Sequence, residues 1–120
     1  MDAEELLRRY AAGERDFQGI ILEYANLTGI ELQFIGLKGA QFRYVNLSGI
    51  NWRSCELIGA EFCYCNLRNA DIESCDLSYA RFFDCDLREI NTRICNLTST
   101  AFTRVNIQCA KLGGFGEDGC

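Results

Sequence analysis

Ile50-Asn51-Trp52-Arg53-Ser54 and Cys55-Glu56-Leu57-Ile58-Gly59 open a stretch, ending at Leu97, in which the chain counts in units of five residues. The third residue of each unit, here called its centre, is large and apolar, and the first residue is small or branched and apolar. A period of five fits neither a helix, which needs about 3.6 residues, nor a strand, which needs about 2. An internal structural repeat is therefore the first hypothesis to test.

The same register extends over the centres from Phe17 to Leu112, giving 20 units with one polar centre, Thr92. A second period of 20 residues runs through it, because phenylalanine is the centre at positions 42, 62, 82 and 102. Cysteine behaves similarly at the first position, in the columns Cys55, Cys75, Cys95 and Cys65, Cys85. A period of 20 indicates four units per turn, with identical residues stacked at the inter-strand spacing of about 4.8 Å.

The pattern of each unit resembles that of the pentapeptide-repeat family: a small apolar residue, Asn or Asp, Leu or Phe, then two polar positions. Ala25-Asn26-Leu27-Thr28-Gly29 and Ala70-Asp71-Ile72-Glu73-Ser74 show it well. The resemblance covers roughly residues 15–114. It implies a right-handed quadrilateral β-helix whose first and third positions both point inward. The entry into the repeat, Glu5 to Phe17, looks like that of small cyanobacterial members, which mostly lack an assigned biochemical role.

We therefore predict an all-β solenoid of about five coils, with four pentapeptides per coil and a short N-terminal capping α-helix. The whole chain, residues 1–120, is expected to form a single pentapeptide-repeat domain. Within it we expect a capping helix over 2–12, a repeat solenoid over 15–114 and a C-terminal tail over 115–120.

The two ends of a solenoid expose apolar side chains and unpaired strand groups, which terminal caps cover. Asp2 can cap the N-terminal helix, whose Leu6, Leu7 and Tyr10 share one face and should pack on the first coil. After the last centre, Phe115 is the one large apolar residue. The C-terminal end is therefore either thinly covered or paired with a second copy, so we expect a monomer, or a dimer through the C-terminal coil.

The corners should lie at the last two residues of each unit. In the first three coils, glycine holds the fifth position on two opposite walls and can supply the positive φ of a type II turn. Later coils place Asn69, Tyr79, Asp84 and Glu89 there. We expect a different turn type at these corners, or an Asn69 that tolerates the left-handed conformation.

The second position carries a column of amides on one wall: Asn26, Asn46, Asn66, Asp86 and Asn106. Stacked amides can hydrogen-bond along the axis of the β-helix, as they do in cross-β arrays. Two readings stay open for this column, a structural ladder and a binding site made of amides. Two hydroxyls, Thr92 and Thr100, occupy inward positions and each need a backbone carbonyl.

Charge and cysteine usage limit the setting in which the chain works. The net charge is −5, yet the stretch from Phe17 to Leu112 is nearly neutral, with 10 acidic and 9 basic residues, so we expect no direct nucleic-acid binding. Five of the eight cysteines lie at inward positions, where cysteine acts as a small hydrophobe. The acidic N-terminus lacks the apolar core of a signal peptide, and no apolar run approaches about 20 residues. We predict a cytoplasmic protein with no membrane partner.

Little in the sequence indicates catalysis or a bound cofactor. Histidine, the commonest general base and metal ligand, is absent. Cys63 and Cys65 look like a ligand pair, but the repeat sends Cys65 inward and Cys63 outward. The inward column Cys55, Cys75 and Cys95 brings sulfurs close enough that its Cα spacing does not exclude a disulfide. We expect no enzyme, no cofactor and no metal site.

One feature indicates recognition. Tyr24, Tyr44 and Tyr64 recur every 20 residues at the fifth, outward position of the phenylalanine-bearing side, and Phe83 lies beside them. Three stacked, partly exposed tyrosines on a rigid wall are typical of a protein-recognition surface, because tyrosine supplies contact area at low entropic cost. Ordinary ladder stacking at an exposed corner is the alternative.

Two functions remain. The first is a rigid, non-catalytic scaffold that binds an unknown protein partner through one wall. The second, suggested by the family resemblance, is mimicry of duplex DNA that occupies a type II topoisomerase such as gyrase. Mimicry requires a continuous line of carboxylates along one wall. The most acidic column here is mixed, reading Asp16, Gly36, Glu56, Asp76 and Asn96.

Overall fold

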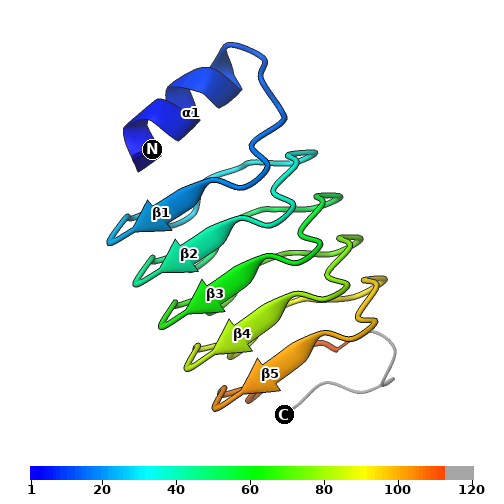
Figure 1. The fold of residues 1–120 in the computed structure, drawn as a ribbon. Helices are drawn as coiled ribbons and strands as arrows, with labels where there is room; N and C mark the ends of the chain where they lie inside the picture. Colours follow the sequence, from blue (N-terminus) through cyan, green and yellow to red (C-terminus); the bar gives the residue numbers. More distant parts are fainter. Residues whose placement is uncertain (113–120) are drawn as a thin grey trace.

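The chain folds as a short helix followed by a β-solenoid, and the computed structural model describes residues 1–112 (Figure 1). The elements are α1 (Ala3–Ala11), β1 (Ile21–Glu23), β2 (Gln41–Arg43), β3 (Glu61–Cys63), β4 (Arg81–Phe83) and β5 (Ala101–Thr103). The strands form one parallel five-stranded sheet in chain order, and each strand residue pairs with the residue 20 positions further on. Four turns of the chain therefore lead from β1 to β5, slightly fewer than the five coils predicted.

Each turn of the chain has four walls. The strands make the first of them, here called the strand wall, and Figure 1 shows them stacked in order. On the other three walls, isolated parallel bridges again join residues 20 apart, as in Asp16–Gly36, Asn26–Asn46 and Glu31–Asn51. The predicted quadrilateral coil of four pentapeptides is confirmed.

Side chains at the second position fix the corners of the three walls that lack strands. Every Asn or Asp there accepts, through Oδ1, the backbone N–H of the residue two positions further on, at 2.9 to 3.2 Å. The strand wall has none of these residues at that position and pairs its backbone in the sheet instead. In the column Asn26, Asn46, Asn66, Asp86 and Asn106 these bonds form within each unit, and a bond along the axis occurs on another wall, where Asn91 Nδ2 donates to Asp71 Oδ1 at 3.3 Å. A local bond of this kind closes with little loss of chain entropy.

The fifth residue of each unit, from Gly19 to Cys109, has a positive φ whatever its type. Asn69, Tyr79 and Glu89 lie at 61°, 61° and 62°, close to the 67° of Gly59. Asn69 adopts the left-handed conformation as predicted, but the different backbone expected at Tyr79 and Glu89 does not occur. Each non-glycine residue in this region costs on the order of 1 kcal/mol. The ladders on both sides of the corner outweigh that cost.

The interior is a column of stacked rings. Phe42, Phe62, Phe82 and Phe102 stack with centroid spacings of 5.0, 4.7 and 5.2 Å and nearly parallel planes. This arrangement confirms the column predicted from the period of 20. Trp52 packs beside this column, with its ring centroid 5.3 Å from Phe42 and 6.0 Å from Phe62, and is fully buried. Within the described residues its Nε1 has no hydrogen-bond partner.

Inward cysteines act as hydrogen-bond donors as well as packing groups. Each thiol donates to the carbonyl of a centre residue in the preceding coil: Cys55 to Leu32, Cys65 to Phe42, Cys75 to Trp52, Cys85 to Phe62 and Cys95 to Ile72. All five are free thiols, and Cys63 is outward and partly exposed, as predicted. The hydroxyl of Thr100 makes the same bond, to Leu77 at 2.7 Å. Valine or alanine could fill these positions but could not donate.

The two ends of the solenoid differ. At the first, α1 covers the opening coil: the Asp2 carboxylate accepts the Glu5 N–H, Leu6 is buried, and the Tyr10 hydroxyl donates to the Gln33 carbonyl at 2.8 Å. At the other end, an apolar cavity of about 180 Å³ is lined by Leu97, Phe102, Val105, Ile107 and Leu112. The predicted tail, residues 115–120, lies outside the described residues. Over residues 1–112, no helix has the length and apolarity needed to cross a bilayer.

Candidate interaction surface

Tyrosines form a stack along the corner that follows the strand wall. The rings of Tyr24, Tyr44 and Tyr64 lie 5.0 and 4.9 Å apart with planes within 7° of parallel. Their side chains point outward because each occupies a left-handed corner, with φ of 53° to 56°. Exposed fractions of 76%, 45% and 43% leave much of each ring accessible to a partner.

Phe83, in β4, continues the row of rings at its C-terminal end. Its ring meets Tyr64 edge-on at a centroid distance of 5.6 Å, and the Arg104 Cζ atom lies over the Phe83 ring, 4.3 Å from its centroid. Arg104 also pairs with Asp84 at 2.9 Å. The hydrogen bond from Arg104 holds the pKa of the Asp84 carboxyl below its usual value. We call Tyr24, Tyr44, Tyr64 and Phe83 the aromatic ridge. The structure brings all four predicted residues together, whereas their role in recognition stays a prediction.

Arg104 and Asp84 were missed as parts of this surface. Both occupy the same corner column as the tyrosines: Asp84 lies one period of 20 residues after Tyr64, and Arg104 lies two periods after it. The period of 20 residues places both in this column, but a charged residue at this position does not by itself indicate an aromatic surface. They close the ridge with an ion pair, so the exposed rings end against a guanidinium that Asp84 holds in place.

A row of amides runs beside the ridge, on the wall that follows it. The Oδ1 atoms of Asn26, Asn46 and Asn66 are held by the backbone N–H groups of residues 28, 48 and 68, at 2.9 to 3.0 Å. This bond fixes the orientation of each amide. Among the described residues, no acceptor is bonded to their Nδ2 groups. We call these three residues the amide row, and it presents unpaired N–H donors at the spacing of the coils, about 4.8 Å.

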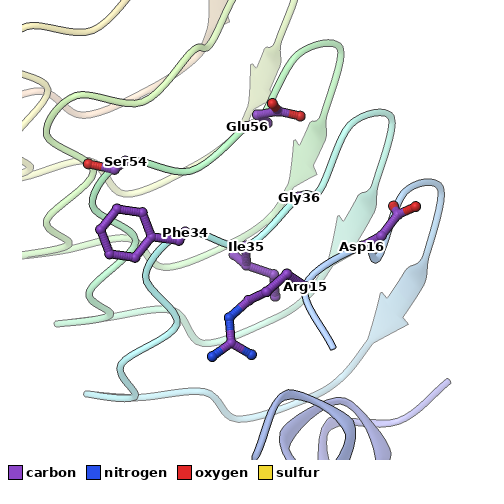
Figure 2. A pocket seen from close by; sticks show the side chains of 7 residues that line it. All are labelled: Arg15, Asp16, Phe34, Ile35, Gly36, Ser54 and Glu56. Atoms are coloured by element: carbon purple, nitrogen blue, oxygen red, sulfur yellow. The ribbon is translucent and has the colours of Figure 1, made fainter. Parts of the chain in front are cut away.

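A second concave feature lies at the diagonally opposite corner (Figure 2). This notch of about 360 Å³ arises because Gly36 lacks a side chain between Asp16 and Glu56. A Cβ at Gly36 would lie 3.3 Å from the Arg15 carbonyl oxygen, a tight contact that a small shift of the Arg15 backbone would have to relieve. Phe34 stands exposed at one side of the notch. Arg15 is already held, 3.7 Å from the Tyr10 ring centroid and bonded to the Tyr10 carbonyl.

Neutralised carboxylates dominate the later coils. Arg53 pairs with Asp71 and Glu73, Arg68 pairs with Glu89, and Arg88 pairs with Asp86. The hydrogen bond from Arg88 holds the pKa of the Asp86 carboxyl below its usual value. The column Asp16, Gly36, Glu56, Asp76 and Asn96 contains two uncharged residues, Gly36 and Asn96. No wall of the described solenoid therefore presents a continuous line of free carboxylates.

Metal and acid–base chemistry find little support in this geometry. Over the part of the chain that the structure describes, no group of three or more Cys, Asp or Glu side chains is arranged to hold a metal ion. Burial raises the pKa of the partly buried Cys95 thiol to about 11, which makes this thiol a poor nucleophile, whereas hydrogen bonds with Cys75 and Cys65 lower the pKa values of Cys55 and Cys85. The hydrogen bond with Cys55, and then burial, raise the pKa of Cys75 far above its usual value.

The chain is similar to known repeat proteins. The family model of pentapeptide repeats matches residues 37–78, in eight copies, and no curated protein matches the chain. A pentapeptide repeat protein from the thylakoid lumen of Arabidopsis thaliana is 22% identical over 80% of this chain and 63% of its own, with a TM-score of 0.57.

Two cyanobacterial structures are also similar. Rfr23 from Cyanothece 51142 is 30% identical over 76% of this chain and 58% of its own, with a TM-score of 0.38. HetL from Nostoc sp. strain PCC 7120, a protein involved in the regulation of heterocyst differentiation, is 17% identical over 98% and 99%, with a TM-score of 0.40. The chain spans less than two thirds of the length of the Arabidopsis protein and of Rfr23. The family model and the four-walled coil show that this chain carries pentapeptide repeats, matched at residues 37–78 within a coil of the same geometry.

Proposed function

We propose that the chain is a rigid, non-catalytic scaffold that binds another protein through the aromatic ridge. The single observation that carries this proposal is the exposed, ordered stack of Tyr24, Tyr44 and Tyr64. Such rings lose little entropy on binding, because their neighbours in the stack already hold them. Aromatic side chains of this kind dominate the binding energy of many protein interfaces.

The surroundings of the ridge support the same reading. Backbone groups along the corner are paired between coils, for example Tyr24 N–H with the Arg43 carbonyl and Tyr44 N–H with the Cys63 carbonyl, both at 3.0 Å. The backbone beneath the rings is therefore held in place. A partner would meet a preformed surface and would not have to order a loop before contact.

Selection from a random peptide library tests the proposal. The wild-type protein is immobilised, peptides are selected, and their Kd values are measured for wild type and for Tyr44→Ala/Tyr64→Ala. We expect the double variant to bind the selected peptides at least about tenfold more weakly, because interface tyrosines commonly contribute more than about 1 kcal/mol each.

Tyr79→Ala is the matched control. Tyr79 has the same left-handed backbone, with φ of 61°, and is also largely exposed, but it stands alone on another corner. Its loss should leave peptide binding unchanged and report any cost of replacing tyrosine at such a corner. Selected peptides that bind wild type and the double variant equally would rule out the ridge.

Mimicry of duplex DNA is the alternative function, and the charges favour it less. Arginines neutralise several carboxylates of the later coils, and the most acidic column is interrupted at Gly36. A gyrase supercoiling assay separates the two functions. We expect no inhibition at micromolar protein, and inhibition that survives Tyr44→Ala/Tyr64→Ala would favour mimicry.

Association and compartment are part of the same proposal. The apolar cavity at the last coil supports a dimer through the C-terminal coil, and light scattering after size-exclusion chromatography measures it. Inward cysteines that act as thiol donors support a reducing compartment such as the cytoplasm. Cys109, by contrast, is disulfide-bonded, so subcellular fractionation with thiol labelling is the decisive measurement.

A further inference from the structure

We propose that the partner segment bound by the ridge is a proline-rich stretch in the polyproline II conformation, lying along the solenoid axis over the ridge and the amide row. This inference rests on the proposed function and adds the chemistry of the partner. It follows from which hydrogen-bonding groups the surface offers and from how they are spaced.

The amide row offers donors and few acceptors. The Oδ1 atoms of Asn46 and Asn66 each accept one backbone N–H group and that of Asn26 accepts two bonds from Thr28, so the two N–H donors of each Nδ2 outnumber the lone pairs left for a partner. A partner backbone that presents carbonyls without N–H groups matches this surface. Proline carries a carbonyl and no N–H, and polyproline II makes no internal hydrogen bonds, so its carbonyls are free to accept.

The spacing of the surface agrees with the same conformation. Two steps of the tyrosine stack, 5.0 and 4.9 Å, span about 9.9 Å. Polyproline II has three residues per turn and a rise of about 3.1 Å, so equivalent residues recur every 9.3 Å or so. A segment along the axis therefore places one face against Tyr24 and Tyr64, two coils apart, with a mismatch of about half an ångström.

The other regular conformations fit less well. A helix has bonded its own carbonyls internally and has none to offer the amide row along its length. A β-strand repeats each face about every 6.7 Å, which matches neither one coil nor two, and its free N–H groups would meet donors. Apolar proline rings also pack favourably on exposed aromatic rings, as they do in aromatic-lined peptide grooves.

Titration of the full-length protein with two capped nonapeptides tests the inference. One is acetyl-(Pro)9-amide, and the other is acetyl-(Gly-Ser-Gly)3-amide, which is flexible and rich in N–H groups. Nuclear magnetic resonance follows the side-chain amide signals of Asn26, Asn46 and Asn66. We expect the proline peptide to shift these signals in a saturable way and the flexible peptide to leave them unchanged.

Asn46→Asp removes a donor pair with little other change, because Asp86 in the same column makes the same local bond to the Arg88 N–H, at 3.1 Å. We expect Asn46→Asp to weaken binding of the proline peptide by about threefold to tenfold, the effect of one or two lost hydrogen bonds. Asn51→Asp is the control, since Asn51 makes the same bond, to the Arg53 N–H, on a wall away from the ridge.

Two results would overturn the inference. One is that the proline peptide does not shift the side-chain amide signals, or that it binds Asn46→Asp and Asn51→Asp with the same affinity. The other is a set of library peptides that depend on Tyr44 and Tyr64 but lack proline, which would leave the ridge in place and remove the polyproline assignment. Library peptides that ignore the ridge would instead defeat the proposed function itself.

Discussion

Phe62 and Phe102 occupy the same column, yet their surroundings differ. Phe62 is fully buried between Phe42 and Phe82, whereas Phe102, in the last described coil, is 41% exposed and stacks within residues 1–112 on one ring, that of Phe82. The residue type and the backbone are the same in both coils. Burial in a solenoid is therefore supplied by the adjacent coil, and each coil gains its stability mainly from its neighbours. The same interaction can therefore be removed from a middle coil and from the last coil, and the two losses in the free energy of unfolding compared.

The largest effect should come from the ring column. Phe62→Ala leaves a cavity between two rings and should lower the free energy of unfolding by about 3 to 5 kcal/mol. Phe102→Ala should lower it by about 1 to 2 kcal/mol, because much of that ring already faces solvent. Urea unfolding followed by the fluorescence of the single tryptophan, the buried Trp52, measures both values.

Equal losses at the two positions would contradict the comparison. They would mean that Phe102 is covered in solution, by a second copy for instance, and dilution would then separate the two causes. Phe82→Ala serves as the control, since Phe82 has ring neighbours on both sides and should behave as Phe62 does.

Much of this column was predictable from the sequence. The period of 20 at Phe42, Phe62 and Phe82 placed rings over one another, and the inward and outward directions of Cys65 and Cys63 followed from the unit. Stacking of the tyrosines was readable in the same way. These features depend on the register alone, and the register is repeated so often that a single irregular centre such as Thr92 does not disturb it.

Corners and side-chain hydrogen bonds were less predictable. Tyr79 and Glu89 have poor preference for a positive φ, so their sequence indicated another turn, but the paired coils above and below impose the same corner. Asn66 could bond along the axis or within its unit, and composition does not distinguish the two. The donors left over at the amide row became visible only once the Oδ1 partners were known.

Loss of a hydrogen bond within one pentapeptide unit should destabilise a middle coil and the last coil equally. Asn66 and Asn106 each accept the N–H two residues further on, at 2.9 and 3.0 Å. Replacing either by Ala should lower the free energy of unfolding by about 1 kcal/mol, the typical worth of one hydrogen bond. Asn66→Asp is the control, because it keeps the acceptor and should lose much less. Urea unfolding of the four proteins checks this, and a loss at Asn66 several times that at Asn106 would show that the amide also joins coils.

Trp52 and Thr92 compare an unpaired buried donor in the middle of the solenoid with a paired donor near its end. Its indole N–H is buried in the middle of the solenoid without a partner among the described residues, whereas the Thr92 hydroxyl, further along the same column, donates to the Lys111 carbonyl of the last coil at 3.1 Å. Trp52→Phe removes the unpaired donor, which offsets part of the lost packing. We expect a loss of less than about 1 kcal/mol, measured by urea unfolding followed by circular dichroism. A loss as large as that of Phe62→Ala would mean that the indole N–H is satisfied in solution.

The smallest expected effect is a pH dependence confined to the join between the last coil and the one before it. Arg104 of the last coil holds the pKa of the Asp84 carboxyl below its usual value, so this pair stabilises the fold above the unfolded-state pKa, near 4. The contribution is lost as the pH falls through the lower folded-state value.

The variant Asp84→Asn removes the charge of this carboxylate and with it the ion pair to Arg104. Melting temperatures of wild type and Asp84→Asn should differ by a constant amount from pH 7 to about pH 5 and converge toward about pH 3. Other carboxylates with lowered pKa values, such as Glu73 and Asp86, titrate in the same range but are present in both proteins, so they cancel in the difference. Amide hydrogen exchange then locates the effect: acid should accelerate exchange in β5 and leave β3 protected, because the Asp84–Arg104 pair joins the coil of β5 to the coil of β4 and does not involve β3.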